Sequence, residues 1–290
     1  MNNANSFNEN DLSKALEQIN SQGKIGSSLD NLKLIFSLID LTSLNTEDTV
    51  GKIRTMCVRV SEFSDHYPDI PNLGAICVYP SMVPVVKDNL KAPGVGIASV
   101  AAGFPSSQTF MPVKEMESRL AVEAGATEID IVISVGRYLE DDMEYIAEEI
   151  RGIKSIIAPS KLKVILETGL LSGAEAIYNA SMVSMRAGAD FIKTSTGKVQ
   201  PAASPEAVLV MCHAIKAYFK ETGIKTGIKP AGGISTPEQA LAYASIVQAI
   251  LGKEWLDPSL FRIGASRLAN GILSEISHIK TGETSDVNYF

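Results

Sequence analysis

The sequence predicts an α/β fold, a (β/α)8 barrel of the TIM type, from two features of its hydrophobic pattern. Short apolar or β-branched runs alternate with longer amphipathic segments along most of the chain. Such alternation is typical of a parallel sheet, in which a helix lies in the crossover between successive strands. An open, doubly wound sheet remains the alternative, because the strand order that separates the two folds cannot be read from a sequence.

The number of strand-like runs favours the closed barrel, which has eight strands. The expected strands are Leu34–Leu41, Gly74–Tyr79, Val95–Ala101, Glu128–Ser134, Leu162–Glu167, Asp190–Thr194, Thr226–Pro230 and Leu260–Gly264. The expected helices between them are Thr46–Ser61, Pro84–Leu90, Val113–Glu123, Met143–Ile157, Ala174–Ala187, Pro205–Glu221 and Pro237–Leu251.

Residues typical of helix ends support these boundaries. Asn45 or Thr46 can cap the first of these helices, and Ser204 precedes Pro205 at the start of another. The stretch Ser235–Gln239 offers a capping box in either of two registers. Glycines that favour a left-handed helix end follow three segments, at Gly125, Gly188 and Gly223.

One domain is the simplest organisation, because no linker, low-complexity block or change of composition interrupts the pattern. The barrel is expected to span residues 31–280. Residues 1–30 are expected to form a polar tail and a short helix from Asn10 or Asp11 to about Asn20, with a frayed arm as the alternative. Residues 281–290 are expected to form a mobile C-terminal tail.

The composition is that of a soluble globular protein, with 45% hydrophobic and 20% charged residues. A net charge of −7 argues against non-specific nucleic-acid binding, although backbone amides can still hold an anionic substrate. The N-terminus lacks the order of a signal peptide, and no apolar run approaches the roughly 18–20 residues that cross a bilayer. We therefore expect a cytoplasmic protein without nucleic-acid or membrane partners.

Charged residues in otherwise apolar strands indicate where the chemistry lies. Active sites of such barrels lie at the carboxyl ends of the strands. Glu167, Lys193 and Lys229 close three successive strands, while Asp40 and Asp130 lie within the first and fourth. Buried charges are costly unless they are paired, so these five groups are expected to converge and satisfy one another.

The two strand-end lysines predict amine chemistry. Burial disfavours an ammonium group, and a second ammonium nearby lowers the pKa further, so that one amine becomes a nucleophile at neutral pH. Lys193 is the candidate nucleophile, the alternative being a structural lysine paired with Asp130 or Glu167. Lys229 either lowers the pKa of Lys193 or moves protons. Asp130 is either a general acid/base acting through water or a counter-ion, and the two roles are compatible.

Glycine-rich turns after the last strands favour a phosphate site beside the lysines. Loops at these positions of a barrel often bind phosphate through backbone N–H groups. The alternative is that these residues are ordinary turn glycines. The candidate residues are Gly197, Lys198, Gly232, Gly233, Gly264 and Ser266.

Neither a metal nor a cofactor is expected. His66, His213 and His278 fall in expected helices or loops, without a carboxylate at ligand spacing. Walker and GxGxxG motifs are absent. The cysteines form no CxxC pair, which favours a reduced setting. Cys77 is interpreted as a core residue, because no histidine is placed to activate it.

Seven segments of the chain together resemble a known family. In order they are Ile39–Thr42, Ala75–Pro80, Ala126–Asp130, Lys163–Gly169, Ala187–Lys198, Lys229–Gly233 and Arg262–Ser266. They are similar to segments of deoxyribose-phosphate aldolase, a class I aldolase family with a (β/α)8 barrel. The resemblance covers roughly residues 32–275, and the segments around the two lysines are long and specific.

The resemblance implies a role for each matching residue. Lys193 matches the family's Schiff-base lysine, and Lys229 and Asp130 match its proton-relay pair. The candidate phosphate residues match the region that holds the substrate phosphate. Residues expected to line the site are Asp40, Thr42, Cys77 and Thr196.

Two departures from the family pattern concern the phosphate end and the tail. Many members have a second serine after the Gly-Ala-Ser turn, where this chain has Arg267. Arg267 either adds a phosphate contact or faces the solvent. Some members end in a tyrosine that assists proton transfer, whereas Tyr289 is penultimate here and Phe290 follows. A contribution of Tyr289 is therefore carried over only as a secondary expectation.

The resemblance implies reversible cleavage of 2-deoxy-D-ribose 5-phosphate to D-glyceraldehyde 3-phosphate and acetaldehyde, in deoxyribose phosphate catabolism. A homo-oligomer is expected, most simply a homodimer. Two other functions remain open. Another lysine-dependent phosphosugar aldolase would differ in substrate length, and a non-catalytic sugar-phosphate-binding barrel would bind its ligand without forming a covalent adduct.

Overall fold

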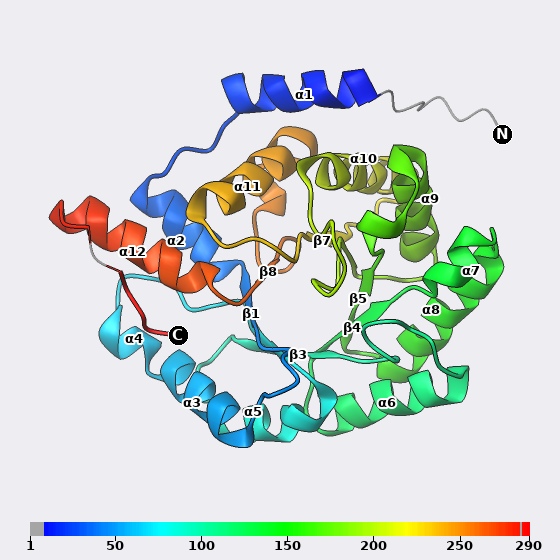
Figure 1. The fold of residues 1–290 in the computed structure, drawn as a ribbon, viewed down its shortest axis with the longest axis horizontal. Helices are drawn as coiled ribbons and strands as arrows, with labels where there is room; N and C mark the ends of the chain where they lie inside the picture. Colours follow the sequence, from blue (N-terminus) through cyan, green and yellow to red (C-terminus); the bar gives the residue numbers. More distant parts are fainter. Residues whose placement is uncertain (1–8, 285) are drawn as a thin grey trace.

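A computed structural model, which describes residues 9–284 and 286–290, contains a barrel of eight parallel strands (Figure 1). The strands are β1 (Ile39–Thr42), β2 (Ala75–Val78), β3 (Gly96–Val100), β4 (Glu128–Val132), β5 (Lys161–Ile165), β6 (Phe191–Lys193), β7 (Gly227–Lys229) and β8 (Ile263–Ala265). Strands β1 to β7 pair in sequence order, and β8 pairs with β1. The bridges Ile228–Phe261 and Ala231–Gly264 join the remaining two edges. This unbroken order confirms the barrel and excludes the doubly wound sheet.

Helices surround the strands, as Figure 1 shows. The α-helices are α1 (Glu9–Gln22), α2 (Leu29–Ser37), α3 (Val50–Ser61), α4 (Phe63–His66), α5 (Val83–Asn89), α6 (Met111–Glu123), α7 (Val135–Leu139), α8 (Met143–Ile157), α9 (Gly173–Arg186), α10 (Pro205–Thr222), α11 (Pro237–Leu251) and α12 (Leu268–Thr281). Short 3-10 helices are η1 (Pro80–Met82), η2 (Thr168–Leu170) and η3 (Lys253–Trp255). Within the described residues, no helix combines the length and the apolar character needed to span a membrane.

The first expected strand is wrong in its first half. Residues 34–37 belong to α2, and the strand begins only at Ile39. Ser28 caps α2 by accepting a hydrogen bond from the Asn31 N–H, and Leu32, Ile35 and Phe36 form its buried face. Helical spacing of the buried residues therefore outweighs the strand-like apolar run.

Two of the helix caps predicted from the sequence are confirmed, and one is wrong. Ser204 caps α10, and Thr236 forms a capping box with Gln239 at the start of α11, both as expected. The cap expected at Asn45 or Thr46 is wrong. The helix starts later, at Val50, with Thr49 as its cap. The sequence analysis also predicted no helix at the positions of α2, α4, α7 and α12.

The N-terminal extension packs on the outside of the barrel. Helix α1 lies across α10 and α11 in Figure 1 and buries Leu12, Leu16 and Ile19. The Ile25 N–H donates a hydrogen bond to Ser245 Oγ at 2.9 Å. The structure therefore has a helix where a short helix was expected, and apolar contacts anchor it to the barrel. The polar tail expected before it falls mainly on residues 1–8, which lie outside the described residues.

The C-terminal residues lie against α4 and α12. The ring of Phe290 stacks on Phe63 with 5.8 Å between centroids, and Tyr289 meets the same ring edge-on at 5.7 Å. Asn270 Oδ1 accepts hydrogen bonds from the N–H groups of both tail residues. The expected mobility of this tail stays a prediction.

Strands β6 and β7 approach closely because Gly227 has no side chain. A Cβ at this position would lie 2.3 Å from Phe191 Cε1, far inside van der Waals contact. The same register places Lys193 beside Lys229. Gly227 therefore helps to hold the two strand-end lysines together.

Replacement of this glycine should destabilise the barrel. We expect Gly227→Ala to lower the free energy of unfolding by about 1–3 kcal/mol, because the new methyl group overpacks the strand pair. Thermal unfolding followed by circular dichroism measures the effect. Gly26→Ala is the matched control, since a Cβ there meets nothing within 4 Å. Equal melting temperatures for the two variants would contradict this account of the strand pair.

Candidate active site

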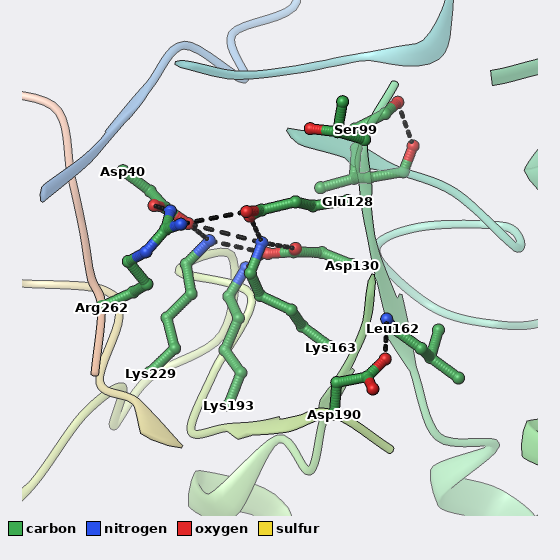
Figure 2. A network of polar contacts seen from close by, with 12 residues as sticks. Asp40, Ser99, Glu128, Asp130, Leu162, Lys163, Asp190, Lys193, Lys229 and Arg262 are labelled. Atoms are coloured by element: carbon green, nitrogen blue, oxygen red, sulfur yellow. Dashed lines mark hydrogen bonds and ion pairs between the residues drawn. The ribbon is translucent and has the colours of Figure 1, made fainter. Parts of the chain in front are cut away.

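Charged side chains occupy the interior of this barrel, where TIM barrels commonly pack apolar layers. The residues are Asp40, Glu128, Asp130, Lys163, Lys193, Lys229 and Arg262 (Figure 2). None of them exposes more than 5% of its surface. They form one connected set of ion pairs, which compensates the cost of removing each charge from water. We call this set the interior ion network.

Asp130 lies at the centre of the interior ion network. Its Oδ2 atom accepts hydrogen bonds from the Nζ atoms of Lys193 and Lys229, both at 2.8 Å. Its Oδ1 atom accepts from Lys163 Nζ at 3.1 Å. The three lysines come from β5, β6 and β7, and Asp130 comes from β4. One carboxylate therefore joins four neighbouring strands.

The surroundings separate the protonation behaviour of the two strand-end lysines. Burial lowers the pKa of Lys193 below the ordinary 10.5, and the nearby Lys229 ammonium lowers it further, against the opposing effect of Asp130. For Lys229, burial is outweighed by Asp130 and Asp40, whose carboxylates raise its pKa. The lysines around Asp130 outweigh its burial and hold its pKa well below the usual range. Lys193 is therefore the amine that most readily becomes neutral.

Three members of the interior ion network, Glu128, Lys163 and Arg262, were not singled out as site residues in the sequence. Arg262 Nη1 lies 2.6 Å from Asp40 Oδ1, and Arg262 Nη2 lies 3.0 Å from Glu128 Oε1. Asp40 Oδ2 in turn lies 2.5 Å from Lys229 Nζ, and Glu128 binds Lys163. The sequence did contain a signal for Glu128, because Glu128 and Asp130 are two residues apart in one strand and therefore lie on the same face of it.

A cavity of about 220 Å³ opens over Lys193 at the carboxyl ends of the strands. Every candidate phosphate residue lines it, together with Thr42 and Thr196. Among the described residues, no carboxylate lines this cavity, whose charged side chains are Lys193, Lys198 and Arg267. The cavity therefore suits an anionic ligand at its outer end and a nucleophilic amine at its floor.

The two loops that follow β6 and β7 line the cavity together with Lys193. Thr194 Oγ1 accepts a hydrogen bond from the Ala231 N–H at 3.0 Å, which ties the end of β6 to the end of β7. Gly232 has φ of +86°, and a Cβ there would lie 3.1 Å from Gly197 Cα. Only glycine permits both this backbone conformation and this approach. The loops are thus fixed with their backbones facing the cavity.

Glu167 holds the β6 loop from the other side. Its carboxylate accepts hydrogen bonds from the Thr196 N–H at 3.1 Å and from Thr196 Oγ1 at 2.6 Å. Thr196 Oγ1 also accepts a hydrogen bond from the Lys198 N–H at 3.0 Å. Glu167 therefore orders the loop that carries Gly197, and it makes no ion pair with the interior ion network.

Five expected site residues do not line the cavity. Asp130 and Lys229 belong to the interior ion network, in which Asp130 contacts Lys193. Asp40 lies within the interior ion network, and Cys77 is buried in β2, where burial raises the pKa of its thiol. Tyr289 lies outside the barrel mouth and donates a hydrogen bond from its hydroxyl to the Arg59 carbonyl at 2.8 Å. Within residues 9–284 and 286–290, no group of three or more His, Cys, Asp or Glu is arranged to hold a metal ion.

Comparisons with known proteins agree with this geometry. A sequence model of the DeoC/LacD family aldolases matches residues 34–268. The deoxyribose-phosphate aldolase of Homo sapiens is 44% identical over 257 residues, covering 85% of this chain and 80% of that protein. The deoxyribose-phosphate aldolase of Mus musculus is 42% identical over 261 residues, covering 85% of this chain and 80% of that protein.

A solved structure supports the fold. The tetrameric deoxyribose phosphate aldolase of Aeropyrum pernix matches with a TM-score of 0.66 and 24% identity, covering 96% of this chain and all of that chain. The family match extends over most of the barrel, from α2 to the first residue of α12. The chain therefore belongs to the DeoC/LacD family of aldolases, which are carbon–carbon lyases.

Proposed function

We propose that this protein is a class I aldolase that reversibly cleaves 2-deoxy-D-ribose 5-phosphate into D-glyceraldehyde 3-phosphate and acetaldehyde. The observation that carries the proposal is the buried amine of Lys193, held 2.8 Å from Asp130 at the floor of a cavity without carboxylates. The names of relatives that are 42–44% identical support this substrate. The proposed setting is cytoplasmic deoxyribose phosphate catabolism by a homo-oligomer, most simply a homodimer.

The first steps form a covalent bond between enzyme and substrate. The neutral Lys193 amine adds to the C1 aldehyde of the open-chain sugar and gives a carbinolamine. Loss of water then leaves a protonated imine at C1. Lys229 supplies the proton that the departing hydroxyl needs, since its raised pKa keeps it an ammonium at neutral pH. Asp130 touches both amines and holds them in position for this transfer.

The imine then makes the carbon–carbon bond breakable. Acetaldehyde contains C1 and C2 of the sugar, so the bond that breaks is C2–C3. A base takes the C3 hydroxyl proton through water, the C2–C3 electron pair moves into an enamine, and glyceraldehyde 3-phosphate leaves. The enamine carbon C2 is then protonated, and hydrolysis of the new imine releases acetaldehyde and restores Lys193. Asp130, Lys229 and water form the proposed relay.

The outer end of the cavity holds the phosphate in this proposal. Gly232, Gly233 and Ser266 offer backbone N–H groups, as expected for anion binding, whereas the Gly264 N–H donates to the Pro230 carbonyl. Lys198 lies across the cavity mouth, where its Nζ donates to the Leu44 carbonyl. Arg267 adds a guanidinium that, within the described chain, makes no hydrogen bond or ion pair with another side chain.

A trapping experiment tests the nucleophile. We expect reduction with borohydride in the presence of acetaldehyde to leave an ethyl-sized adduct on Lys193, because the imine forms there. Peptide mass spectrometry locates the adduct, and Lys193→Ala should carry none. An adduct on Lys229 would reverse the assignment of the two lysines. No adduct on the folded wild-type protein would sink the aldolase mechanism and favour a non-catalytic sugar-phosphate-binding barrel.

The pH dependence of catalysis tests the partner lysine. Lys229→Met removes the proton donor and the like charge beside Lys193. The pKa of Lys193 should then rise, so that its neutral form appears only at higher pH. We expect kcat/KM to fall by about 10²–10⁴ and its rise with pH to move to more alkaline values. Lys229→Arg, which keeps the charge, should not shift the profile. Identical profiles for both variants would argue against this role.

Substrate discrimination tests Arg267. We expect Arg267→Ser to raise KM for 2-deoxyribose 5-phosphate by about tenfold, since one charge-assisted phosphate contact is worth roughly 1.5–3 kcal/mol. Activity on unphosphorylated 2-deoxyribose should change little. Steady-state kinetics on the two sugars measure the difference. An equal effect on both sugars, or none on the phosphorylated sugar, would place the guanidinium in solvent.

A further inference from the structure

One ion pair of the interior ion network lies away from the cavity and has no part in the steps above. Arg262 directly precedes β8, and Glu128 is the first residue of β4. Their side chains meet with 3.0 Å between Arg262 Nη2 and Glu128 Oε1. Neither residue lines the cavity. Neither side chain is therefore assigned a contact with the substrate.

The pair is nevertheless joined to the nucleophile by unbroken contacts (Figure 2). On one side, Arg262 binds Asp40, Asp40 binds Lys229, and Lys229 shares the Asp130 Oδ2 atom with Lys193. On the other side, Glu128 binds Lys163, and Lys163 binds the remaining oxygen of the same aspartate. Both routes end at the carboxylate that touches the Lys193 amine.

We propose that Arg262 is a positioning residue that keeps the Lys193 amine uncharged, because its guanidinium offsets the Glu128 carboxylate and so completes the charge balance of the interior ion network. Apart from Lys193, the network contains three cationic and three anionic side chains. With Arg262 and Glu128 both present, these six charges cancel, and a protonated Lys193 would leave one buried charge in excess. This inference rests on the proposed function, because only imine chemistry requires a neutral amine.

The physical reason is that a net charge in a buried site is costly. Unit charges in a protein interior interact over many ångströms, because little water screens them. When Arg262 loses its charge, the network gains one unit of negative charge and binds a proton more readily. That proton goes to Lys193, since a neutral amine is a far stronger base than any of the carboxylates. Loss of the Glu128 charge acts in the opposite direction.

Other titratable groups near the amine do not alter this reasoning. Cys77 of β2 lies close to Lys193, but burial raises the pKa of its thiol and keeps it neutral at pH 7. Glu167 follows β5 and is held by Thr196 rather than by the network. Neither group changes between the variants compared below, so differences between variants report the Arg262–Glu128 pair alone.

The experiment compares four full-length variants by the rate of borohydride trapping with acetaldehyde across pH. Arg262→Gln should move the midpoint of the trapping profile upward by about one pH unit, which is about tenfold slower trapping below the midpoint. Glu128→Gln should move it downward. The double variant E128Q/R262Q restores the balance and should return the midpoint to near the wild-type value. Arg262→Lys keeps the charge and should leave the midpoint in place even if packing suffers.

The outcomes distinguish an effect on the pKa of Lys193 from a purely structural role. If both single variants slow trapping at every pH without moving the midpoint, or if the double variant is worse than either single variant, the pair is structural and the proposal fails. Circular dichroism melts show which variants are folded, and Arg262→Lys still decides if Arg262→Gln does not fold. Absence of trapping in the wild-type protein would instead overturn the proposed aldolase function, so the two failures are distinguishable.

Discussion

The contact on which the rest of the site depends is a single carboxylate shared by three lysines. Asp130 can hold Lys163, Lys193 and Lys229 only if β4 to β7 keep one register around the barrel. Small residues enforce that register, as at Gly227, where Phe191 takes the space of a side chain. An interior filled with charges is costly in comparison with apolar packing. This barrel therefore gives up stability in its centre to place an amine in a dry, electrostatically ordered site.

The barrel topology separates the two chemical tasks of the site. The amine comes from the last residue of β6, whereas the candidate phosphate residues come from the end of β8 and from the turns after β6, β7 and β8. All of these turns lie at the carboxyl ends of parallel strands and therefore meet at one opening. Hydrogen bonds such as that between Thr194 and Ala231 fix the turns to one another. The distance between Lys193 and the candidate phosphate residues is thus set by the sheet rather than by flexible loops.

The sequence allowed the fold to be predicted and singled out Lys193 and Lys229, but it did not reveal most of the side chains that surround them. Lys193 and Lys229 were recognisable because each ends an apolar strand, where a charge has no structural reason to be. Lys163 was not recognisable. Lys163 and Lys161 are two residues apart in one strand, so both lie on the same face. Only the three-dimensional barrel shows which of the two lysines is buried. Arg262 fell within the expected strand Leu260–Gly264 without ending it, and in the structure it directly precedes β8. The apolar run 34–37 fits helix and strand equally well until its packing is known.

The number of carboxylate partners distinguishes the proposed nucleophile from the other two lysines. Lys163 lies within 4 Å of Asp40, Glu128 and Asp130, and its pKa is raised despite complete burial. Lys229 has two carboxylate partners, and its pKa is raised as well. Among the described residues, Lys193 has one carboxylate partner, Asp130, which it shares with the other two lysines, and burial lowers its pKa. The pKa of each of the three lysines therefore depends on the number of anions around it. Lys193, the lysine with the fewest carboxylate partners, is the one that lines the cavity.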